Sequence, residues 1–403
     1  MQSCRWIKKA CGVFLPFFLG EALAQAPPQM RLEAAPALLR RQNTPVLDQT
    51  GVCVGWFESS RSTLLDAEGR ILFQSNEKIL QQATSADGSM YAVLEKVVRQ
   101  KAKTPESFFT LRFLNRSGQL NGSYHFSQHR DDPLPQIIFA ATGEHLLIAH
   151  PATARLIFLQ IDGRVLREMS LFEEAPYANE RPLFVAAGAQ AFILLSQKTP
   201  ATNTKPVAPM LIYFSNNGEE QWRRELPSGA AGGLAISADG AWIIANRYTV
   251  NGARVASTSS IFNFQGEMQG TIDGLFRRAI FAKNGNSVLL MERRQLRAVD
   301  FRSGKTLWQA SLARRAEMFV DIAATAAHDK IFALVAENAF KESRFVFEKA
   351  RLLGFDNAGR QQTEIALPNH LVAPVLKISN DDNRLTLGAE GVLQQYTVVQ
   401  SSR

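Results

Sequence analysis

The sequence predicts an all-β protein, a single β-propeller of seven four-stranded antiparallel blades, with eight blades as the alternative. Short apolar runs alternate with turn residues along the chain, and the cleanest unit, 233–273, contains four such runs. Two pairs of these runs are broken at Asp239-Gly240 and Gln265-Gly266. A glycine at the break supplies the positive φ that a tight hairpin demands. The unit recurs about every 49 residues, a period typical of propeller blades.

Two series of turns alternate regularly along the chain. The first turn of each unit is at Asp87-Gly88, Thr142-Gly143, Ala187-Gly188, Asp239-Gly240, Asn284-Gly285, His328-Asp329 and Asp381-Asp382. The second turn is at Glu68-Gly69, Ser117-Gly118, Asp162-Gly163, Asn217-Gly218, Gln265-Gly266, Ser303-Gly304 and Ala358-Gly359. A four-stranded sheet cannot bury both of its faces alone, so we expect these sheets to stack radially around an axis.

The number of strands at the two ends predicts how the ring closes. Strands expected at 52–57, 62–66 and 71–74 supply the tail of one unit, and the last three strands are expected at 375–379, 384–387 and 392–398. Six complete units lie between them, at 80–126, 134–171, 181–226, 232–273, 276–312 and 318–366. An N-terminal strand paired with the last three closes the ring and removes its open edges. Because the N-terminal segment has more strands than this closure needs, eight blades is the alternative.

The N-terminus predicts export. Arg5, Lys8 and Lys9 precede a short apolar stretch, and Ala22-Leu23-Ala24 offers small residues at the cleavage spacing. We therefore divide the chain into a signal peptide (1–24), a Pro/Ala-rich leader (25–50) and a propeller domain (51–403), and expect a periplasmic or secreted protein. No later segment approaches the roughly 20 apolar residues of a membrane span. A retained membrane anchor is the alternative reading of 1–24.

Cysteine usage after signal removal indicates how the fold is stabilised. Removal of 1–24 leaves Cys53 as the one cysteine, so an internal disulfide is excluded and stability must come from the core and from ring closure. Cys53 lies in an apolar run and is expected to be a small buried residue.

The turns resemble those of two propeller families. Asp239-Gly240, between two apolar runs, is similar to the SPDG turn of WD40-type repeats, and 299–308 (VDFRSGKTLW) resembles the D-x-x-T-G-K-x-L-W signature of PQQ-type repeats. Weaker copies of the second signature lie at 159–166 and 213–222. The resemblance implies a propeller fold and no particular activity. The Trp-Asp ending of WD40 strands is missing, and tryptophan recurs in only two of the PQQ-like turns, which argues against a bound quinone.

Catalytic and metal-binding patterns are not found in the sequence. It has no G-x-S-x-G and no G-x-x-x-x-G-K motif, and the spacing of its six histidines favours ordinary strand or loop positions over metal ligands. Paired acids occur at Asp131-Asp132, Glu173-Glu174, Glu219-Glu220 and Asp381-Asp382. Adjacent acids in loops do not provide two carboxylates across a cleft, as glycoside hydrolysis needs. Asp321 and Lys377 are expected in first strands, which line the channel of a propeller. We predict no catalytic residue, metal or cofactor.

Basic residues concentrate in one predicted blade. Between Arg277 and Arg315 there are ten basic and two acidic residues, a local charge of +8. Three arginine doublets are expected in links on one face, because each link is two strand reversals from the next. They are Arg277-Arg278, Arg293-Arg294 and Arg314-Arg315. Such a rim provides a positive field for a carboxylate, phosphate or sulfate, although a solvated rim without a partner fits the pattern equally.

We therefore interpret the chain as an exported, non-catalytic propeller that binds a protein or an anionic envelope polymer through its loop-rich, arginine-bearing face. Long loops expected at 96–107, 197–209, 247–257 and 338–349 support this reading. The alternative is an enzyme or enzyme subunit, either a quinoprotein-like dehydrogenase chain or a polysaccharide-active propeller. Nucleic-acid binding is disfavoured, despite a pI of about 9.5, because the basic residues lack interleaved aromatics.

Overall fold

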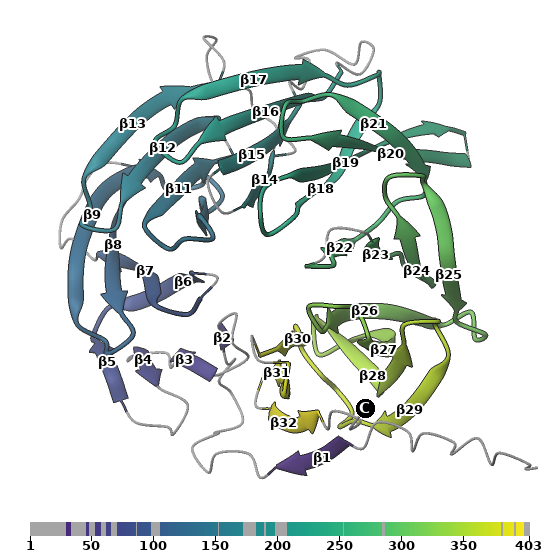
Figure 1. Ribbon diagram of the computed structural model, residues 1–403. Coiled ribbons are helices and arrows are strands. Elements are labelled where there is room, and N and C mark those ends of the chain that lie inside the picture. Colours follow the sequence, from purple (N-terminus) through teal and green to yellow (C-terminus); the bar gives the residue numbers. More distant parts are fainter. Residues whose placement is uncertain are drawn as a thin grey trace, which may run out of the picture.

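In the computed structural model of the chain, the described residues form eight four-stranded antiparallel sheets around a central axis (Figure 1). The structure describes residues 30–33, 46–47, 53–57, 62–65, 71–85, 87–97, 105–151, 153–171, 183–188, 191–197, 208–252, 254–283, 287–379, 382–390 and 392–398. Within them every regular element is a strand. The predicted signal peptide and most of the predicted leader lie outside the described residues, as do the turns at Glu68-Gly69 and Asn284-Gly285.

Each of blades 1 to 7 is a four-stranded meander, numbered from the axis outward. Blade 1 contains β2 (Val46–Leu47), β3 (Cys53–Phe57), β4 (Ser62–Leu65) and β5 (Ile71–Ser75). Blade 2 contains β6 (Lys78–Thr84), β7 (Met90–Val97), β8 (Glu106–Asn115) and β9 (Leu120–His129). Blade 3 contains β10 (Gln136–Phe139), β11 (His145–His150), β12 (Arg155–Gln160) and β13 (Val165–Ser170). Blade 4 contains β14 (Leu183–Ala187), β15 (Ala191–Ser196), β16 (Met210–Ser215) and β17 (Glu220–Glu225).

The second half of the ring repeats this arrangement. Blade 5 contains β18 (Ala230–Ile236), β19 (Trp242–Asn251), β20 (Arg254–Asn263) and β21 (Met268–Asp273). Blade 6 contains β22 (Arg278–Phe281), β23 (Ser287–Met291), β24 (Gln295–Asp300) and β25 (Lys305–Ser311). Blade 7 contains β26 (Glu317–Ala324), β27 (Lys330–Lys341), β28 (Arg344–Asp356) and β29 (Gln361–Ala366). Blade 8 contains β30 (Val375–Ile378), β31 (Arg384–Ala389), β32 (Val392–Val398) and, as its outer strand, β1 (Met30–Glu33).

The closure predicted from the sequence is confirmed, but the ring has eight blades, the alternative, and not the expected seven. β1 pairs antiparallel with β32, from Met30 opposite Val398 to Glu33 opposite Gln395. β3 to β5 do not join the C-terminal strands. They form their own sheet with β2, in which Val46 lies opposite Gly55. Both β1 and β2 come from the stretch expected to be a leader. The predicted number of blades was one too low because β1 and β2 are too short to show an alternating pattern.

The core lies between neighbouring blades, because second strands such as β11 bury both faces. In β11, Leu146 and Ile148 belong to the cluster shared with blade 2, whereas Leu147 and Ala149 belong to the cluster shared with blade 4. Successive side chains of a strand point to opposite faces, so a strand with neighbours on both sides is continuously apolar. The outer strands, such as β13, consist of exposed and half-buried residues, as expected for a strand at the rim (Figure 1).

Glycines in the turns between third and fourth strands dock one blade on the previous one. Gly266 has a φ of 76°, and a Cβ there would lie 2.8 Å from the Trp222 ring. Gly359, with a φ of 75°, has the same relation to Trp308, at 2.5 Å. Trp222 also donates from Nε1 to the Phe264 carbonyl at 2.8 Å. These two tryptophans, which belong to the PQQ-like turns, are therefore blade-docking residues.

Turns between first and second strands meet around one mouth of the channel. The Ala141 N–H donates to the Gly188 carbonyl at 2.9 Å, and the Lys283 N–H to the Ala326 carbonyl at 2.7 Å. These bonds join successive blades, so all first strands run in the same direction. Hairpins between second and third strands therefore emerge at the opposite face, together with the links between blades.

Candidate functional site

The three links that carry the arginine doublets lie side by side on the hairpin face of blade 6. The Arg277 N–H donates to the Met291 carbonyl at 2.7 Å. The Phe319 N–H donates to the Arg293 carbonyl at 2.9 Å, and the Leu312 N–H to that of Arg294 at 3.1 Å. We call the exposed residues Arg277, Arg293, Arg314 and Arg315 the arginine rim.

Arg278 does not belong to this rim. It begins β22 and forms an ion pair and hydrogen bond with Asp321 of β26. Asp321, 7% exposed, also accepts the N–H groups of Ile322 at 2.9 Å and Leu376 at 2.8 Å. One carboxylate thus connects the first strands of blades 6, 7 and 8. Adjacent strand residues point to opposite sides, which separates Arg278 from Arg277.

Two further arginines of the doublets have partners. Arg294 donates from Nη2 to the Leu312 carbonyl at 2.7 Å, which fastens the blade 6 hairpin to the next link. Arg314 lies 3.6 Å from Glu317, a carboxylate that also accepts from Arg351 at 2.9 Å. Glu317 is 4% exposed, so a single buried charge is balanced by two guanidinium groups.

The remaining arginines are free. Arg277, Arg293 and Arg315 are exposed, and in the part of the chain that the structure describes their side chains make no hydrogen bond or ion pair. Unpaired guanidinium groups gathered on one rim are suited to bidentate contact with carboxylates or phosphates. The predicted set of six therefore divides into three free arginines, one weakly paired and two structural.

Two long hairpins rise on the same face, from the blades on either side of blade 6. β19–β20 and β27–β28 occupy stretches that the sequence predicted as loops, 247–257 and 338–349. Their ends carry exposed apolar residues: Val250 and Val255, 60% and 59% exposed, and Phe340 and Phe345, 65% and 64% exposed. The two phenylalanine rings form an edge-to-face pair with centroids 5.1 Å apart. The expected loop at 197–209 lies almost entirely outside the described residues.

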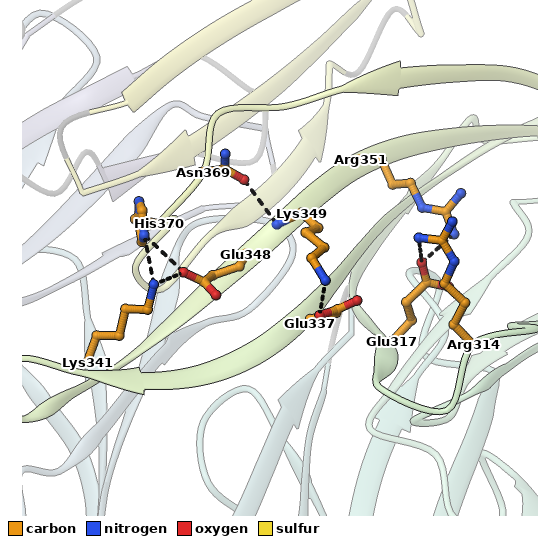
Figure 2. A network of polar contacts seen from close by, with 9 residues as sticks. All are labelled: Arg314, Glu317, Glu337, Lys341, Glu348, Lys349, Arg351, Asn369 and His370. Carbon is orange, nitrogen blue, oxygen red and sulfur yellow. Dashed lines mark hydrogen bonds and ion pairs between the residues drawn. The ribbon is translucent and has the colours of Figure 1, made fainter.

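The projecting end of the blade 7 hairpin, 338–347, is here called the arm. Figure 2 shows the polar contacts that hold its base: Lys349 donates to Glu337 at 2.9 Å, and Glu348 contacts both Lys341 and His370. The hydrogen bond from Lys341, together with the charge of that residue and the neighbouring His370, keeps the pKa of Glu348 below its usual value. Arg344 reaches blade 8, where Nη1 lies 3.0 Å from both carboxylate oxygens of Glu390.

The channel contains a cavity of about 680 Å³. It follows the first strands of blades 6 to 8 and the turn after the first strand of blade 5, and small side chains such as Ala282, Ala323 and Ala324 leave the space. Lys377 lines it, as its place in a first strand predicted, and Asp321 supports Arg278 at its wall. The charges around the cavity are mixed, with Asp239 and Asp382 beside Arg278, Lys283 and Lys377.

The histidines are dispersed. His150 and His328 are each 5% exposed, and burial lowers the pKa of both to about 4. His125 lies 2.9 Å from the Thr110 hydroxyl on the neighbouring strand. Among the described residues no three or more His, Cys, Asp or Glu side chains gather as metal ligands would. None of the described segments forms a helix able to cross a bilayer.

Comparison with known proteins supports the fold alone. No family model matches the chain, and no curated protein matches its sequence. The chain is similar to the C-terminal WD40 domain of Sif2, with 12% identity, a TM-score of 0.58, and 92% of this chain and 98% of that chain covered. In all, 1141 chains of solved structures match, and a fold shared so widely does not determine an activity. The WD40-like propeller predicted from the turns is thus confirmed.

Proposed function

We propose that this protein is a non-catalytic scaffold that binds a partner protein through the hairpin face of blades 5 to 7. The observation that carries the proposal is the arginine rim, where Arg277, Arg293 and Arg315 are exposed and have no partner among the described residues. Like charges held together repel one another, and a purely structural rim has no need of them. The WD40-type fold supports an interaction role, because its ring of hairpins provides a broad rigid surface.

The chemistry of the rim indicates an acidic partner surface. Each free guanidinium can donate two parallel hydrogen bonds to a carboxylate, which lysine cannot reproduce. Between exposed groups this attraction is screened by salt, because the Debye length falls from about 10 Å at 0.1 M to 3 Å at 1 M. Binding should therefore weaken as the salt concentration rises. An anionic envelope polymer, the alternative ligand, shares this salt dependence.

The test begins with a photo-crosslinking amino acid in place of Arg293, used to capture the neighbour in cells for identification. The captured protein is then purified, and its affinity is measured at 0.05 and 0.5 M salt. We expect Arg293→Glu with Arg315→Glu to weaken binding at least tenfold at low salt. Arg116→Glu, an exposed arginine in a turn of the opposite face, is the matched control.

Three outcomes are distinguishable. Equal binding by the folded double variant and the parent contradicts the proposal. Crosslinks to polysaccharide and not to protein favour the anionic polymer. A loss shared by Arg116→Glu assigns the effect to overall charge and not to the rim.

We also propose that the protein is exported to the periplasm or beyond. The support is the basic start, apolar stretch and Ala22-Leu23-Ala24 of the N-terminus. The N-terminal sequence of the protein recovered from cells tests this. A first residue at or near Gln25 agrees with export, and an intact Met1 in the cytoplasm contradicts it.

A further inference from the structure

The arm of blade 7 has one closed and one open edge. Along β28, Phe347 and Leu371 exchange two backbone hydrogen bonds of 2.8 and 3.0 Å. Along β27, pairing with β26 ends at Glu317 opposite Glu337. Beyond that pair, in the described stretch 338–341, the structure gives β27 backbone pairing only with β28. An open strand edge is a template for another strand.

The turn at the end of the arm determines which backbone groups face the open side. Glu342 and Ser343 have φ values of 48° and 64°, as in a two-residue type I′ hairpin. In such a hairpin the flanking pair, Lys341 and Arg344, is hydrogen-bonded, and successive residues alternate. The N–H and C=O groups of Asn338 and Phe340 therefore point away from β28. Both residues are exposed.

The arm is held rigid with this edge open. The Lys349–Glu337 pair fixes its base, and the Lys341–Glu348–His370 contacts fix its middle (Figure 2). Arg344 ties its end to Glu390. A preorganised edge loses little conformational entropy when a partner binds. The edge also carries none of the proline residues that commonly block pairing.

The surroundings of the open edge are cationic at one end and apolar at the other. The link that precedes Glu317 contains Arg314 and Arg315, and it ends at Glu317, where β26 begins to pair with β27. Phe340 and Phe345 lie at the outer end. Phe340 is the third residue after Glu337, which is about 10 Å farther along the strand. A segment along this edge thus meets arginine first and an aromatic pair about three residues later.

We propose that the β27 edge of the arm binds an extended, acidic segment of a partner protein as an added strand. The segment pairs through its backbone with Asn338 and Phe340, places carboxylates at Arg314 and Arg315, and rests an apolar side chain on the phenylalanine pair. Backbone pairing gives such complexes affinity, and side chains give them specificity. This inference rests on the proposed protein-binding function and names its partner as a strand-forming acidic segment.

A lipid surface fits the arm less well. Glu342 lies in the turn beyond the phenylalanine pair, and Glu348 and Glu390 lie on the same side of the molecule as the arm. An anionic membrane would repel these carboxylates, and Glu342 would have to enter the interface before either aromatic ring.

The experiment uses fluorescein-labelled ten-residue peptides on the intact protein. One peptide joins four acidic residues to a Val/Leu block, and its scrambled, all-acidic and all-apolar forms are the comparisons. Two further forms carry N-methyl groups on alternate residues, in the two possible registers. We expect the acidic–apolar peptide to bind best, and N-methylation to weaken it at least tenfold in one register only. Because this uses the unmodified protein, it does not depend on the folding of any variant.

Variants locate the site. Asn338→Pro removes an outward N–H, Phe340→Ala removes the anchor and Arg315→Glu reverses the charge, and each is expected to weaken the peptide at least fivefold. The controls are Phe264→Ala and Arg116→Glu, exposed residues in turns of the opposite face. Thermal melting confirms that each variant is folded.

The outcomes separate this inference from the proposed function. Strand addition is overturned if no peptide binds, or if N-methylation is without effect in both registers. If the crosslinked partner still depends on Arg293 and Arg315 in that case, the proposed function stands without it. If the protein co-sediments with phosphatidylserine vesicles but does not bind the peptides, the inference is overturned and the arm is assigned to a membrane surface.

Discussion

At the scale of single residues, the close approach of glycines to the preceding blade is the contact that tolerates least change. The Trp222 ring lies only 2.8 Å from where a Cβ of Gly266 would be, and its hydrogen bond to the Phe264 carbonyl prevents it from moving away. A side chain there meets both an unfavourable positive φ and a steric clash. Elsewhere a positive φ occurs without the clash: Gly252 has a φ of 60° and nothing within 4 Å of a built Cβ.

These two glycines make a matched prediction. Gly252→Ala should cost about 1 kcal/mol in free energy of unfolding, from backbone strain alone. Gly266→Ala should cost about 2 to 4 kcal/mol, because overpacking adds about 1 to 3 kcal/mol. Urea denaturation of the two variants and the parent measures the difference. Equal losses of unfolding free energy in the two variants would show that the blade interface accommodates a methyl group without overpacking.

Two buried histidines predict a loss of stability in acid. Burial is the main cause that lowers the pKa of His150 and His328 to about 4, whereas an unfolded histidine has a pKa near 6.5. Between these values the unfolded state binds protons that the folded state excludes. Stability therefore falls as pH falls from 6.5 to 4, by about 2 kcal/mol for each histidine at pH 4.5, and levels off below pH 4.

The double variant His150→Gln, His328→Asn checks this, since Asn tolerates the φ of 57° at position 328. Its urea midpoint should change less between pH 7 and pH 4.5 than that of the parent. An unchanged pH dependence would assign the acid sensitivity to carboxylates.

The arginine doublets show what could be predicted at this scale. Their links share a face because strand reversals can be counted, and the backbone bonds of Arg277, Arg293 and Arg294 confirm that these links adjoin. The pairing of Arg278 with Asp321 was not predictable, because it joins residues 43 positions apart. Alternation along the strand could have predicted that Arg277 and Arg278 diverge.

At the scale of elements, apolar runs bounded by turn residues predicted strands wherever the runs were long enough to be recognised. The central parts of second strands such as β11 and β15 are continuously apolar because they have a blade on each side. Many of the turns contain glycine because φ is positive there. The ends of the β19–β20 and β27–β28 hairpins were predicted as loops because they project from the core and lose the apolar signal. β1 and β2, of four and two residues, are too short for any periodicity. Their identity depends on pairing partners that lie elsewhere in the chain.

At the scale of the whole molecule, ring closure depends on one pair of strands. Blade 8 is completed by β1, which covers the edge of β32. The sequence predicted this closure because its last unit has three strands and lacks a fourth, whereas its N-terminal segment has strands outside any complete unit. It did not determine the blade number, because one N-terminal strand closes the ring while another begins a blade of its own.

Deletion of β1 is the prediction at this scale. A protein that begins at residue 46 retains seven complete blades but exposes the edge of β32. We expect a lower melting temperature and concentration-dependent association, because an open edge pairs with other chains. Light scattering coupled to size-exclusion chromatography and a thermal melt measure both. A monomer that melts like the parent would show that β1 is dispensable.

Closure by β1 also has a consequence for the order of folding. β1 is synthesised before every other strand of the propeller but pairs last, because its partner β32 ends at Val398. During synthesis the growing chain can assemble blade upon blade, but its two ends cannot meet until the final strand has left the ribosome. Contacts between residues so distant in sequence are slow to form. The last step of folding is therefore expected to be the docking of the two ends, and an incomplete chain remains an open arc.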